Sequence, residues 1–448
     1  MTDETTETQR DQFRSKRGFI LASIGSAVGM GNIWRFPAMV SLWGGLTFII
    51  PYLIFVVLIT ATGVIAEFAL GRAARAGPSG AFGMCTELRW GNRKLGERIG
   101  LIPVVGSLAL AIGYTCVMAW ITKYMVMAFT GDLSDMGQDM GAISGMFDAT
   151  SSAWGANIWV VIAAVITLLI MSRGVSGGIE KANKFLMPVL FILLIALAVY
   201  VGTLPGASAG YSYILTVDFG LLAEPLVWIF AFGQAFFSLS VAGNGSVVYG
   251  SYFGRKDSIP SSAFYVGLFD TVSALLAAAI IIPAMTAGGA DPTQGGPGLM
   301  FVYLVNVFNG MEGGMIVGIV FFVCVFFAGL ASILNLYETP VAFIQEKLGA
   351  SRLLATLSMV ALGGAVALCI QSIVSPWMDG VSIYICPLGA LLAAMMLFWV
   401  AGREFTMRNV NEGADRPLGR WFFPVGKYAY CALTLIALVA GALLGGIG

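Results

Sequence analysis

The sequence predicts an all-α, polytopic membrane protein with about eleven transmembrane helices. Hydrophobic residues make up 58% of the 448 positions and charged residues only 11%, whereas a soluble domain averages roughly 25% charged residues. Apolar runs of about 20 residues, long enough to cross a bilayer core as a helix, recur along the whole chain. Lys and Arg residues gather in alternate connections between these runs, which is typical of a multi-pass protein.

Each expected span is an apolar run bounded by polar or charged residues. The spans are residues 18–41, 47–70, 100–129, 157–172, 183–203, 223–251, 261–286, 312–345, 352–371, 379–401 and 421–447. The chain then divides into a cytoplasmic N-terminal segment, a repeat of five helices, an inverted repeat of five helices, and a loop with the eleventh helix. These four parts are residues 1–17, 18–203, 204–401 and 402–448.

The charged residues predict the orientation. With the N-terminus inside, all Lys and Arg residues except Arg35 and Lys123 fall on the cytoplasmic side, allowing a few residues of the flanking helix ends. The loop 130–156 on the other side carries Asp residues but no Lys or Arg. Because cytoplasmic loops are enriched in Lys and Arg, we expect a cell-membrane protein with a cytoplasmic N-terminus and an external C-terminus.

Several functions find little support in the composition. The chain has no His, a formal net charge of zero, and six scattered Cys residues without a CxxC pair. His is the commonest general base and metal ligand, and nucleic-acid binding needs a basic surface. We therefore expect neither an enzyme, nor a Cys/His metal or redox centre, nor a nucleic-acid partner.

Two expected spans contain glycine-rich interruptions. The first span contains GSAVGMGN (25–32), and the sixth contains SLSVAGNG (238–245). One interpretation is close helix packing, because Gly25 and Gly29 form a small-xxx-small pair. The other is two broken helices, 1 and 6, whose freed backbone groups line a transport site. The corresponding positions of the two interruptions in an inverted repeat favour broken helices.

Ionisable residues inside a membrane are costly and usually functional. Arg35 follows the first interruption by one helical turn, and Asp379, at the start of the tenth span, is its expected partner. Asp270 lies in the middle third of the seventh span and is expected to face a cation. Glu67, late in the second span, either serves the transport site or ties helices together as a hydrogen-bond acceptor.

The motifs resemble those of the neurotransmitter:sodium symporter family. Residues 25–37, GSAVGMGNIWRFP, are similar to the signature of the family's first helix. Further similarities along the chain are Ile50-Pro51-Tyr52, Glu67 and Gly71-Arg72 in the second helix, Tyr114 and Trp120 in the third, Arg173-Gly174 and residues 177–181 in the fifth, residues 233–240 in the sixth, and residues 328–332 in the eighth. The eleven-helix arrangement is similar to that of many bacterial members.

This resemblance implies Na⁺-coupled import of an α-amino acid by alternating access, with the lipid bilayer as surroundings. An unwound helix supplies carbonyl oxygens for Na⁺ and N–H groups for a carboxylate. The implied substrate site is Ser26, Ala27, Met30, Gly31, Leu110, Tyr114, Phe237, Ser238, Ser240, Gly243, Ser332 and Leu336. The implied first sodium site is Ala27, Asn32, Ser238 and Asp270, and the second is Gly25, Val28, Ala328 and Ser332.

The resemblance also implies two gates. On the external side, Tyr114 and Phe237 would close over the substrate beneath an ion pair between Arg35 and Asp379. The cytoplasmic gate would consist of Arg10, Phe13, Tyr252 and Glu346.

Two departures from the family pattern concern the sodium and substrate sites. Ala331 stands where many members place an oxygen ligand for the second sodium, so the chain binds either one or two Na⁺ ions. Gly243 stands where a bulky residue often contacts the substrate, which predicts room for a large hydrophobic or aromatic amino acid. The alternative is that Gly243 is simply part of the helix break.

A third departure concerns chloride. Tyr52, Gln234 and Ser238 resemble three of the chloride ligands in chloride-dependent members. The fourth position is Ala274, or Ser273 if the alignment shifts by one residue. Because Asp270 supplies a fixed negative charge nearby, we predict chloride-independent transport.

Gly29 favours an α-amino acid, because monoamine carriers of the family have an aspartate there and glycine leaves space for the substrate's own carboxylate. The main alternative function is a transport-inactive amino-acid sensor or receptor on the same fold. A membrane-embedded enzyme and a passive channel are weaker alternatives, since no nucleophile–base pair is visible and an aromatic lid would close the site.

Overall fold

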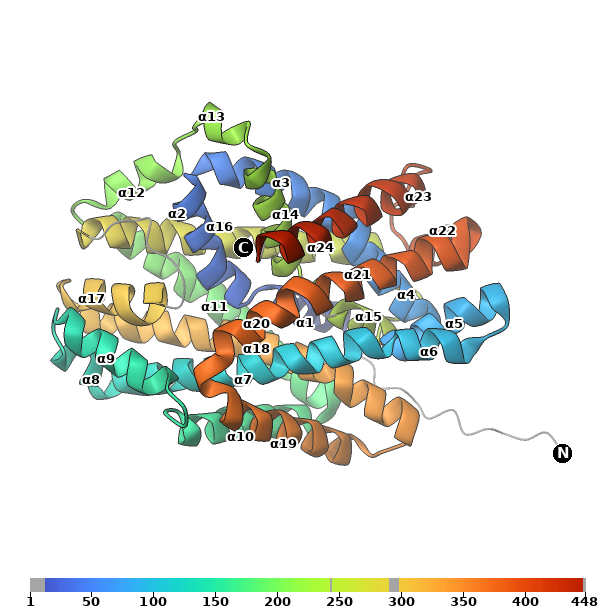
Figure 1. Cartoon of the computed structure of the whole chain (residues 1–448), viewed down its shortest axis with the longest axis horizontal. Helices are drawn as coiled ribbons and strands as arrows, with labels where there is room; N and C mark the ends of the chain where they lie inside the picture. The colour runs from blue at the N-terminus through green and yellow to red at the C-terminus, as the bar shows by residue number, and fades with distance from the viewer. Residues whose placement is uncertain (1–12, 242–243, 290–297, 446–448) are drawn as a thin grey trace.

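The computed structural model describes residues 13–241, 244–289 and 298–445, and within these ranges it contains helices and turns but no strand. The described chain is therefore all-helical, as the composition predicts. Figure 1 shows long helices that run side by side, mostly along the longest axis of the molecule, with shorter helices both at its ends and, as for α1 (Lys16–Ala27) and α15 (Gly245–Ser251), in its middle.

The helices of the first half lead from the N-terminal segment to the middle of the chain. They are α1 (Lys16–Ala27), η1 (Gly31–Arg35), α2 (Phe36–Trp43), α3 (Leu46–Ile59), η2 (Thr60–Val64), α4 (Ile65–Ala74), α5 (Pro78–Trp90), α6 (Arg93–Ile99), α7 (Leu101–Thr130), α8 (Asp132–Asp135), α9 (Met140–Ser151), α10 (Asn157–Met171), η3 (Val175–Ile179) and α11 (Glu180–Gly202).

The second half of the chain also contains both long and short helices. Its elements are α12 (Ala207–Ile214), α13 (Phe219–Leu222), α14 (Pro225–Ser238), α15 (Gly245–Ser251), α16 (Ile259–Ala287), η5 (Leu299–Tyr303), α17 (Leu304–Asn309), α18 (Gly314–Leu348), α19 (Arg352–Ile370), η6 (Gln371–Ile373), α20 (Val374–Gly380), η7 (Val381–Ile385), α21 (Cys386–Met395), η8 (Met396–Ala401), α22 (Gly402–Asn411), α23 (Phe422–Pro424), η9 (Val425–Tyr430) and α24 (Cys431–Leu444).

Seven helical runs in the described part are long and apolar enough to cross a membrane. They are Leu46–Ala74, Arg93–Thr130, Val175–Gly202, Ile259–Ala287, Gly314–Leu348, Arg352–Asn411 and Phe422–Leu444. Shorter apolar helices are Asn157–Met171, Pro225–Ser238 and Leu299–Asn309. The run Arg352–Asn411 is not one straight helix, since Figure 1 shows the chain turning back between α19 and α21.

The fifth predicted span begins earlier than its charges suggested. Helical structure starts at Val175 instead of residue 183, after Gly174 turns the chain with a φ of 82°. The charges that delayed the predicted start are satisfied locally. Glu180 forms an ion pair with Lys184 at 2.6 Å and accepts the Arg14 backbone N–H at 2.7 Å. A helix can continue through charged residues that are paired in this way, whereas a prediction from apolar runs alone ends the helix there.

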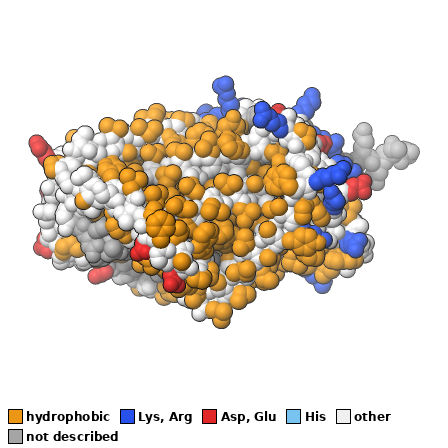
Figure 2. Space-filling view, turned by 90° about the horizontal axis from the view of Figure 1, so that it is seen from above, with side chains coloured by type: hydrophobic (Ala, Val, Ile, Leu, Met, Phe, Trp, Pro, Cys, Tyr) orange, Lys and Arg blue, Asp and Glu red, His pale blue; other side chains and the backbone are white. Residues whose placement is uncertain are grey.

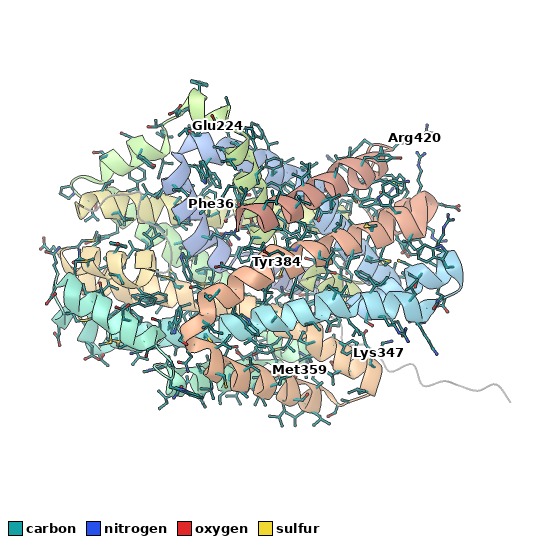
Figure 3. The ribbon with its side chains drawn as sticks, viewed as in Figure 1. Phe36, Glu224, Lys347, Met359, Tyr384 and Arg420 are labelled. Carbon is teal, nitrogen blue, oxygen red and sulfur yellow. The ribbon has the colours of Figure 1, made fainter. Side chains whose placement is uncertain are left out.

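The surface separates apolar from charged side chains. In Figure 2 hydrophobic side chains cover the middle of the molecule. Lys and Arg gather at the right-hand end, together with some Asp and Glu, while the left-hand end shows Asp and Glu without Lys or Arg. Large apolar side chains such as Val57, Ile192 and Leu435 face outward. Figure 3 places Lys347 and Arg420 toward the basic end. A helical protein with such an apolar belt fits a bilayer.

The core has two parts, and the first span lies between them. One cluster is built mainly on α7, α10, α11, α18 and α19. The other is built mainly on α3, α4, α14, α15, α16, α21 and α24. Ile24 and Val28 pack into the first cluster, whereas Phe19 and Ala27 pack into the second. The interruption after α1 is therefore held at the boundary between two packed bodies.

Candidate functional site

The first span is interrupted in the interior of the molecule. Val28, directly after α1, is extended (φ −70°, ψ 104°) while its N–H still donates to a carbonyl of α1 at 2.6 Å. In a continued helix the Gly29 N–H would donate to the Gly25 carbonyl. Here the Gly29 N–H donates to the Asn32 side chain at 2.9 Å. The interruption thus leaves the Gly25 carbonyl without its helical donor.

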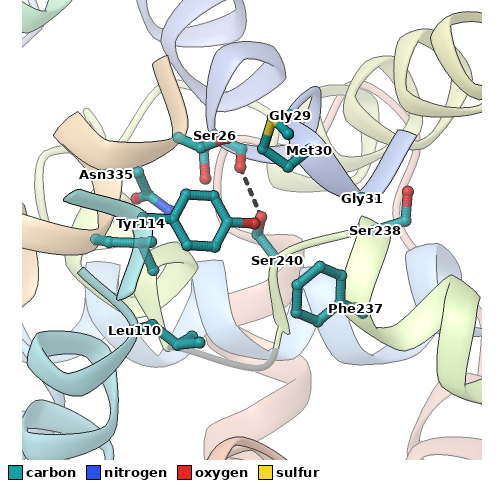
Figure 4. A pocket seen from close by; sticks show the side chains of 13 residues that line it. Ser26, Gly29, Met30, Gly31, Leu110, Tyr114, Phe237, Ser238, Ser240 and Asn335 are labelled. Carbon is teal, nitrogen blue, oxygen red and sulfur yellow. Dashed lines mark hydrogen bonds between the residues drawn. The ribbon is translucent and has the colours of Figure 1, made fainter. Parts of the chain in front are cut away.

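A second interruption separates α14 from α15. Ser240 and Asn244 have left-handed backbone conformations there, with φ of 54° and 51°, which residues other than glycine rarely adopt. Strain of this kind persists where the surroundings hold it, often at functional sites. The Ser240 hydroxyl donates to the Ser26 carbonyl at 2.6 Å, as the dashed line in Figure 4 shows. The two interruptions are therefore bonded to each other.

Both interruptions line one cavity, which α7 and α18 complete. The lining residues are Ser26, Ala27, Gly29, Met30, Gly31, Leu110, Tyr114, Phe237, Ser238, Ser240, Ser332, Asn335 and Leu336. They surround an empty volume of about 460 Å³, which includes space open to solvent. Of the residues expected to bind substrate, Gly243 lies outside the described residues, and the structure brings all the others to this cavity.

Asn335 is a cavity residue that the sequence analysis missed. It is buried on α18, and its Oδ1 atom has no hydrogen-bond partner among the described residues. The available signal was its position three residues after Ser332, because side chains at that spacing share a helix face.

Asp270, on α16, is fully buried and surrounded by hydrogen-bond donors. The Asn32 Nδ2 atom lies 2.7 Å from its Oδ1, and the Ser238 hydroxyl oxygen lies 2.9 and 3.0 Å from its two carboxylate oxygens. The Tyr52 hydroxyl donates to Oδ2 at 3.5 Å. Three side chains of the expected first sodium site thus converge, and Ala27 lines the adjoining cavity.

The Asn32 amide points opposite to the expected direction. Its NH₂ group, and not its oxygen, faces Asp270 and Ser238, while the oxygen accepts the Gly29 N–H. A carboxylate attracts the donor side of an amide, which explains this orientation. A half-turn about χ2 would exchange the two ends and direct the oxygen toward Asp270.

The residues of the expected second sodium site lie where the first interruption approaches α18. A Cβ atom added to Gly29 would collide with the Ser332 hydroxyl and lie 3.9 Å from the Ala328 carbonyl oxygen. A Cβ atom added to Gly25 would lie 3.3 Å from the Ala331 side chain. Glycine at these two positions therefore permits the close approach of α1 and α18.

On the expected external side, Arg35 packs against the aromatic lid. Its guanidinium lies 4.6 Å from the centre of the Phe237 ring, a distance typical of a cation–π contact. Among the ion pairs of the described residues, none joins Arg35 to Asp379. The structure brings Arg35 to Phe237 but does not place the two expected gate charges within ion-pair distance.

Of the residues expected at the cytoplasmic gate, the structure brings Phe13 and Tyr252 into contact. Arg10 lies outside the described residues. The Phe13 ring packs edge-on against Tyr252 at 6.0 Å between centres, and Glu346 accepts the Gly77 N–H at 2.8 Å.

A buried charge pair that was not expected from the sequence lies beside Tyr252. The Tyr252 hydroxyl donates to Glu338 at 2.6 Å, and Arg352 donates to both oxygens of the same carboxylate at 2.7 and 2.6 Å. The signal was Glu338 within the long apolar run of α18, because a fully buried carboxylate needs a partner. This pair joins the ends of α18 and α19 to the segment after α15.

Comparisons with known proteins point to one family. The family model of the sodium:neurotransmitter symporters matches residues 10–138 and 142–443. A sodium-dependent transporter of Methanocaldococcus jannaschii is 31% identical, with the alignment covering 97% of this chain and 90% of that protein. The sodium-dependent transporter YhdH of Bacillus subtilis is 33% identical over 76% of this chain and 74% of that protein.

One solved structure extends the comparison to the fold. The crystal structure of MhsT in complex with L-phenylalanine is similar with a TM-score of 0.84 and 32% sequence identity. The similarity covers 96% of this chain and 100% of that chain.

Proposed function

The chain belongs to the sodium:neurotransmitter symporter family, which consists of membrane transporters and not enzymes, and we propose that it imports an α-amino acid with Na⁺ by alternating access. The observation that carries this proposal is the cavity where two helix interruptions meet beside a buried carboxylate. Free backbone groups and a fixed negative charge are what a zwitterion and a hard cation require.

The substrate is a large hydrophobic or aromatic amino acid. Its carboxylate meets the backbone N–H groups of Met30 and Gly31 and the Tyr114 hydroxyl, and its amine meets carbonyls around Ser26 and Ser238. The side chain packs against the apolar wall formed by Leu110, Phe237 and Leu336. The phenylalanine bound to MhsT, a protein of similar fold, supports a substrate of this size.

The first sodium ion binds beside Asp270, and transport does not require chloride. The Asn32 amide turns about χ2 so that its oxygen joins Ala27, Ser238 and Asp270 around the ion. Ser238 and Tyr52, two of the donors that would hold chloride, are already directed at the Asp270 carboxylate. The Ser273 hydroxyl donates to the Asp270 carbonyl at 2.8 Å, so it is also engaged.

A second sodium ion binds between α1 and α18. Its ligands are the carbonyls of Gly25, Val28 and Ala328 and the Ser332 hydroxyl. The missing helical donor of Gly25 and the close approach of Ser332 to Gly29 support this position.

The architecture is that of eleven spans in two inverted repeats. Residues 1–17 lie in the cytoplasm, helices 1–5 occupy 18–203, helices 6–10 occupy 204–401, and helix 11 follows within 402–448. The two repeats place the interrupted helices 1 and 6 at corresponding positions, which alternating access around a fixed site requires.

Uptake into proteoliposomes tests the proposal. With an inward Na⁺ gradient, we expect labelled phenylalanine, tryptophan or leucine to accumulate. Each of these amino acids should also compete strongly with labelled alanine. No accumulation should occur when K⁺ or choline replaces Na⁺. Replacing chloride by gluconate should leave the rate unchanged.

Each part of this proposal can fail separately. Loss of uptake in gluconate would refute chloride independence alone. Equally poor competition by leucine and tryptophan against alanine would refute the large pocket. Amino-acid binding without accumulation would favour the sensor alternative over a symporter.

A further inference from the structure

Asn183 is a buried amide that the proposed sites do not use. It lies near the start of α11 and is 0% exposed. Its Nδ2 atom donates to the Ile179 carbonyl, one helical turn earlier, at 2.9 Å. Its Oδ1 atom has no hydrogen-bond partner in the described part of the chain. A buried acceptor without a partner is costly, so we expect a donor or a cation to bind to this oxygen.

The orientation of this amide is set by its donor side. A rotation that exchanged Nδ2 and Oδ1 would place two oxygens against each other at Ile179, which is repulsive. The oxygen must therefore point away from α11. A Cβ atom added to Gly25 would collide with Asn183 Oδ1 and lie 3.0 Å from its Cγ, so the amide oxygen faces α1 at Gly25.

Ala331 faces the same point of α1. The Cβ position at Gly25 that meets the Asn183 oxygen also lies 3.3 Å from the Ala331 Cβ. One turn further along, Gly29 faces the Ser332 hydroxyl and the Ala328 carbonyl. The amide oxygen of α11 and the oxygens of α18 therefore face successive turns of the same segment, at Gly25 and at Gly29 beside the interruption after α1.

We propose that the Asn183 amide oxygen is a ligand of the second sodium ion and replaces the oxygen that Ala331 lacks. This inference rests on the proposed function, because it adds a ligand from α11 to the site between α1 and α18. A side-chain carbonyl is a suitable ligand for a hard cation. It is also neutral, so it leaves the charge of the site unchanged.

Na⁺-dependent thermal stabilisation of the purified protein tests the ligand without requiring transport. The melting temperature is measured from low to high NaCl, with KCl holding the ionic strength constant. We expect Asn183→Ala to raise the Na⁺ concentration for half-maximal stabilisation by roughly tenfold, as loss of one charge-assisted contact implies. Adding Ala331→Ser to Asn183→Ala should restore much of the response, because it returns an oxygen to a side chain that also faces Gly25.

Two further variants separate a sodium ligand from a structural role. Asn183→Asp keeps an oxygen but loses the bond to Ile179, so the Na⁺ response should survive even if the melting temperature falls. Thr167→Ala is the matched control, because Thr167 is buried on α10 and also donates to the carbonyl one turn earlier, at 2.9 Å. It should leave the Na⁺ response unchanged.

The outcomes distinguish this inference from the function on which it rests. A wild-type protein that Na⁺ stabilises no better than K⁺ would overturn the proposed sodium coupling, and the inference with it. If Na⁺ stabilises the wild-type protein and Asn183→Ala responds to Na⁺ in the same way, the inference alone is wrong. If Asn183→Ala does not fold, loss of the Na⁺ response in Asn183→Asp would overturn it equally.

Discussion

Asp270 brings a carboxylate into the interior, and its neighbours explain how the fold tolerates it. A buried charge is costly unless it is hydrogen-bonded, and Asn32, Ser238 and Tyr52 surround this one. The sequence predicts the carboxylate from its place in an apolar run. It cannot predict its partners from local pattern, since Asn32 and Asp270 are 238 positions apart. The resemblance to a family supplied that connection.

The residues missed by the sequence analysis are amides and charges whose role depends on packing. The spacing of Asn335 from Ser332 indicates a shared helix face, whereas the sequence around Asn183 does not indicate what its side chain contacts. The environment of the Asn183 oxygen is visible only in the structure, where α1 approaches α11 and α18. Similarly, the partners of Glu338 are visible only in the structure, where Arg352 and Tyr252 reach it.

At Gly29 the absence of a side chain is required. We expect Gly29→Ala to push the Ser332 hydroxyl out of its position, because the new Cβ would collide with it. Overpacking of this kind costs about 1–3 kcal/mol, and the displaced hydroxyl would weaken Na⁺ binding as well. The melting temperature and the Na⁺ dependence of uptake would both report the change.

Gly145→Ala provides the control for this substitution. A Cβ at Gly145, in α9, would meet open space, so alanine should stabilise the helix by up to about 1 kcal/mol. Wild-type stability and Na⁺ dependence in Gly29→Ala would show that α1 and α18 are not in the close contact described.

At the scale of elements, sequence pattern located the helices better than their ends. Apolar runs marked the long helices, and glycine clusters marked both interruptions. The fifth helix begins before the expected span, at Val175, and Glu180 inside it is paired with Lys184. The left-handed conformation at Ser240 has no sequence signature, because a tertiary contact with Ser26 holds it, whereas Asn244 is a residue type that adopts this conformation more readily. Local pattern thus predicts the elements and the regions where they break, and packing fixes the backbone conformation at each break.

The link between α18, α19 and the segment after α15 depends on Glu338. We expect Glu338→Gln to destabilise the protein by about 3–5 kcal/mol, because it leaves the Arg352 charge without its buried partner. It should also loosen this end of the bundle, since the glutamine amide keeps only one oxygen for the Tyr252 and Arg352 donors and turns an N–H donor toward them. Thermal unfolding and the access of thiol reagents to a cysteine introduced at Ser246 would measure the two effects.

Glu87→Gln is the matched control on the surface. Glu87 and Arg93 form an ion pair at 3.0 Å with side chains 52% and 49% exposed, and exposed pairs contribute only about 0–1 kcal/mol. Equal effects of Glu338→Gln and Glu87→Gln would contradict a structural role for the buried pair.

At the scale of the whole molecule, the distribution of charge predicts which end faces the cytoplasm. Figure 2 places the Lys and Arg residues at one end of the apolar belt. The four Asp residues of the loop 130–156 belong to the segment around α8 and α9, at the other end in Figure 1. Because Lys and Arg side chains are retained in the cytoplasm, the basic end with α5 and α22 should lie inside.

Tags at the two termini test both this orientation and the number of spans. Figure 1 shows α24 running from α23, at the basic end, toward the opposite end, so the C-terminus should be external. On intact cells an impermeant antibody should reach a C-terminal tag, and it should reach an N-terminal tag only after permeabilisation. Reversed labelling would refute the orientation. Labelling of both tags from one side would imply an even number of spans and contradict eleven, because only an odd number separates the termini across the membrane.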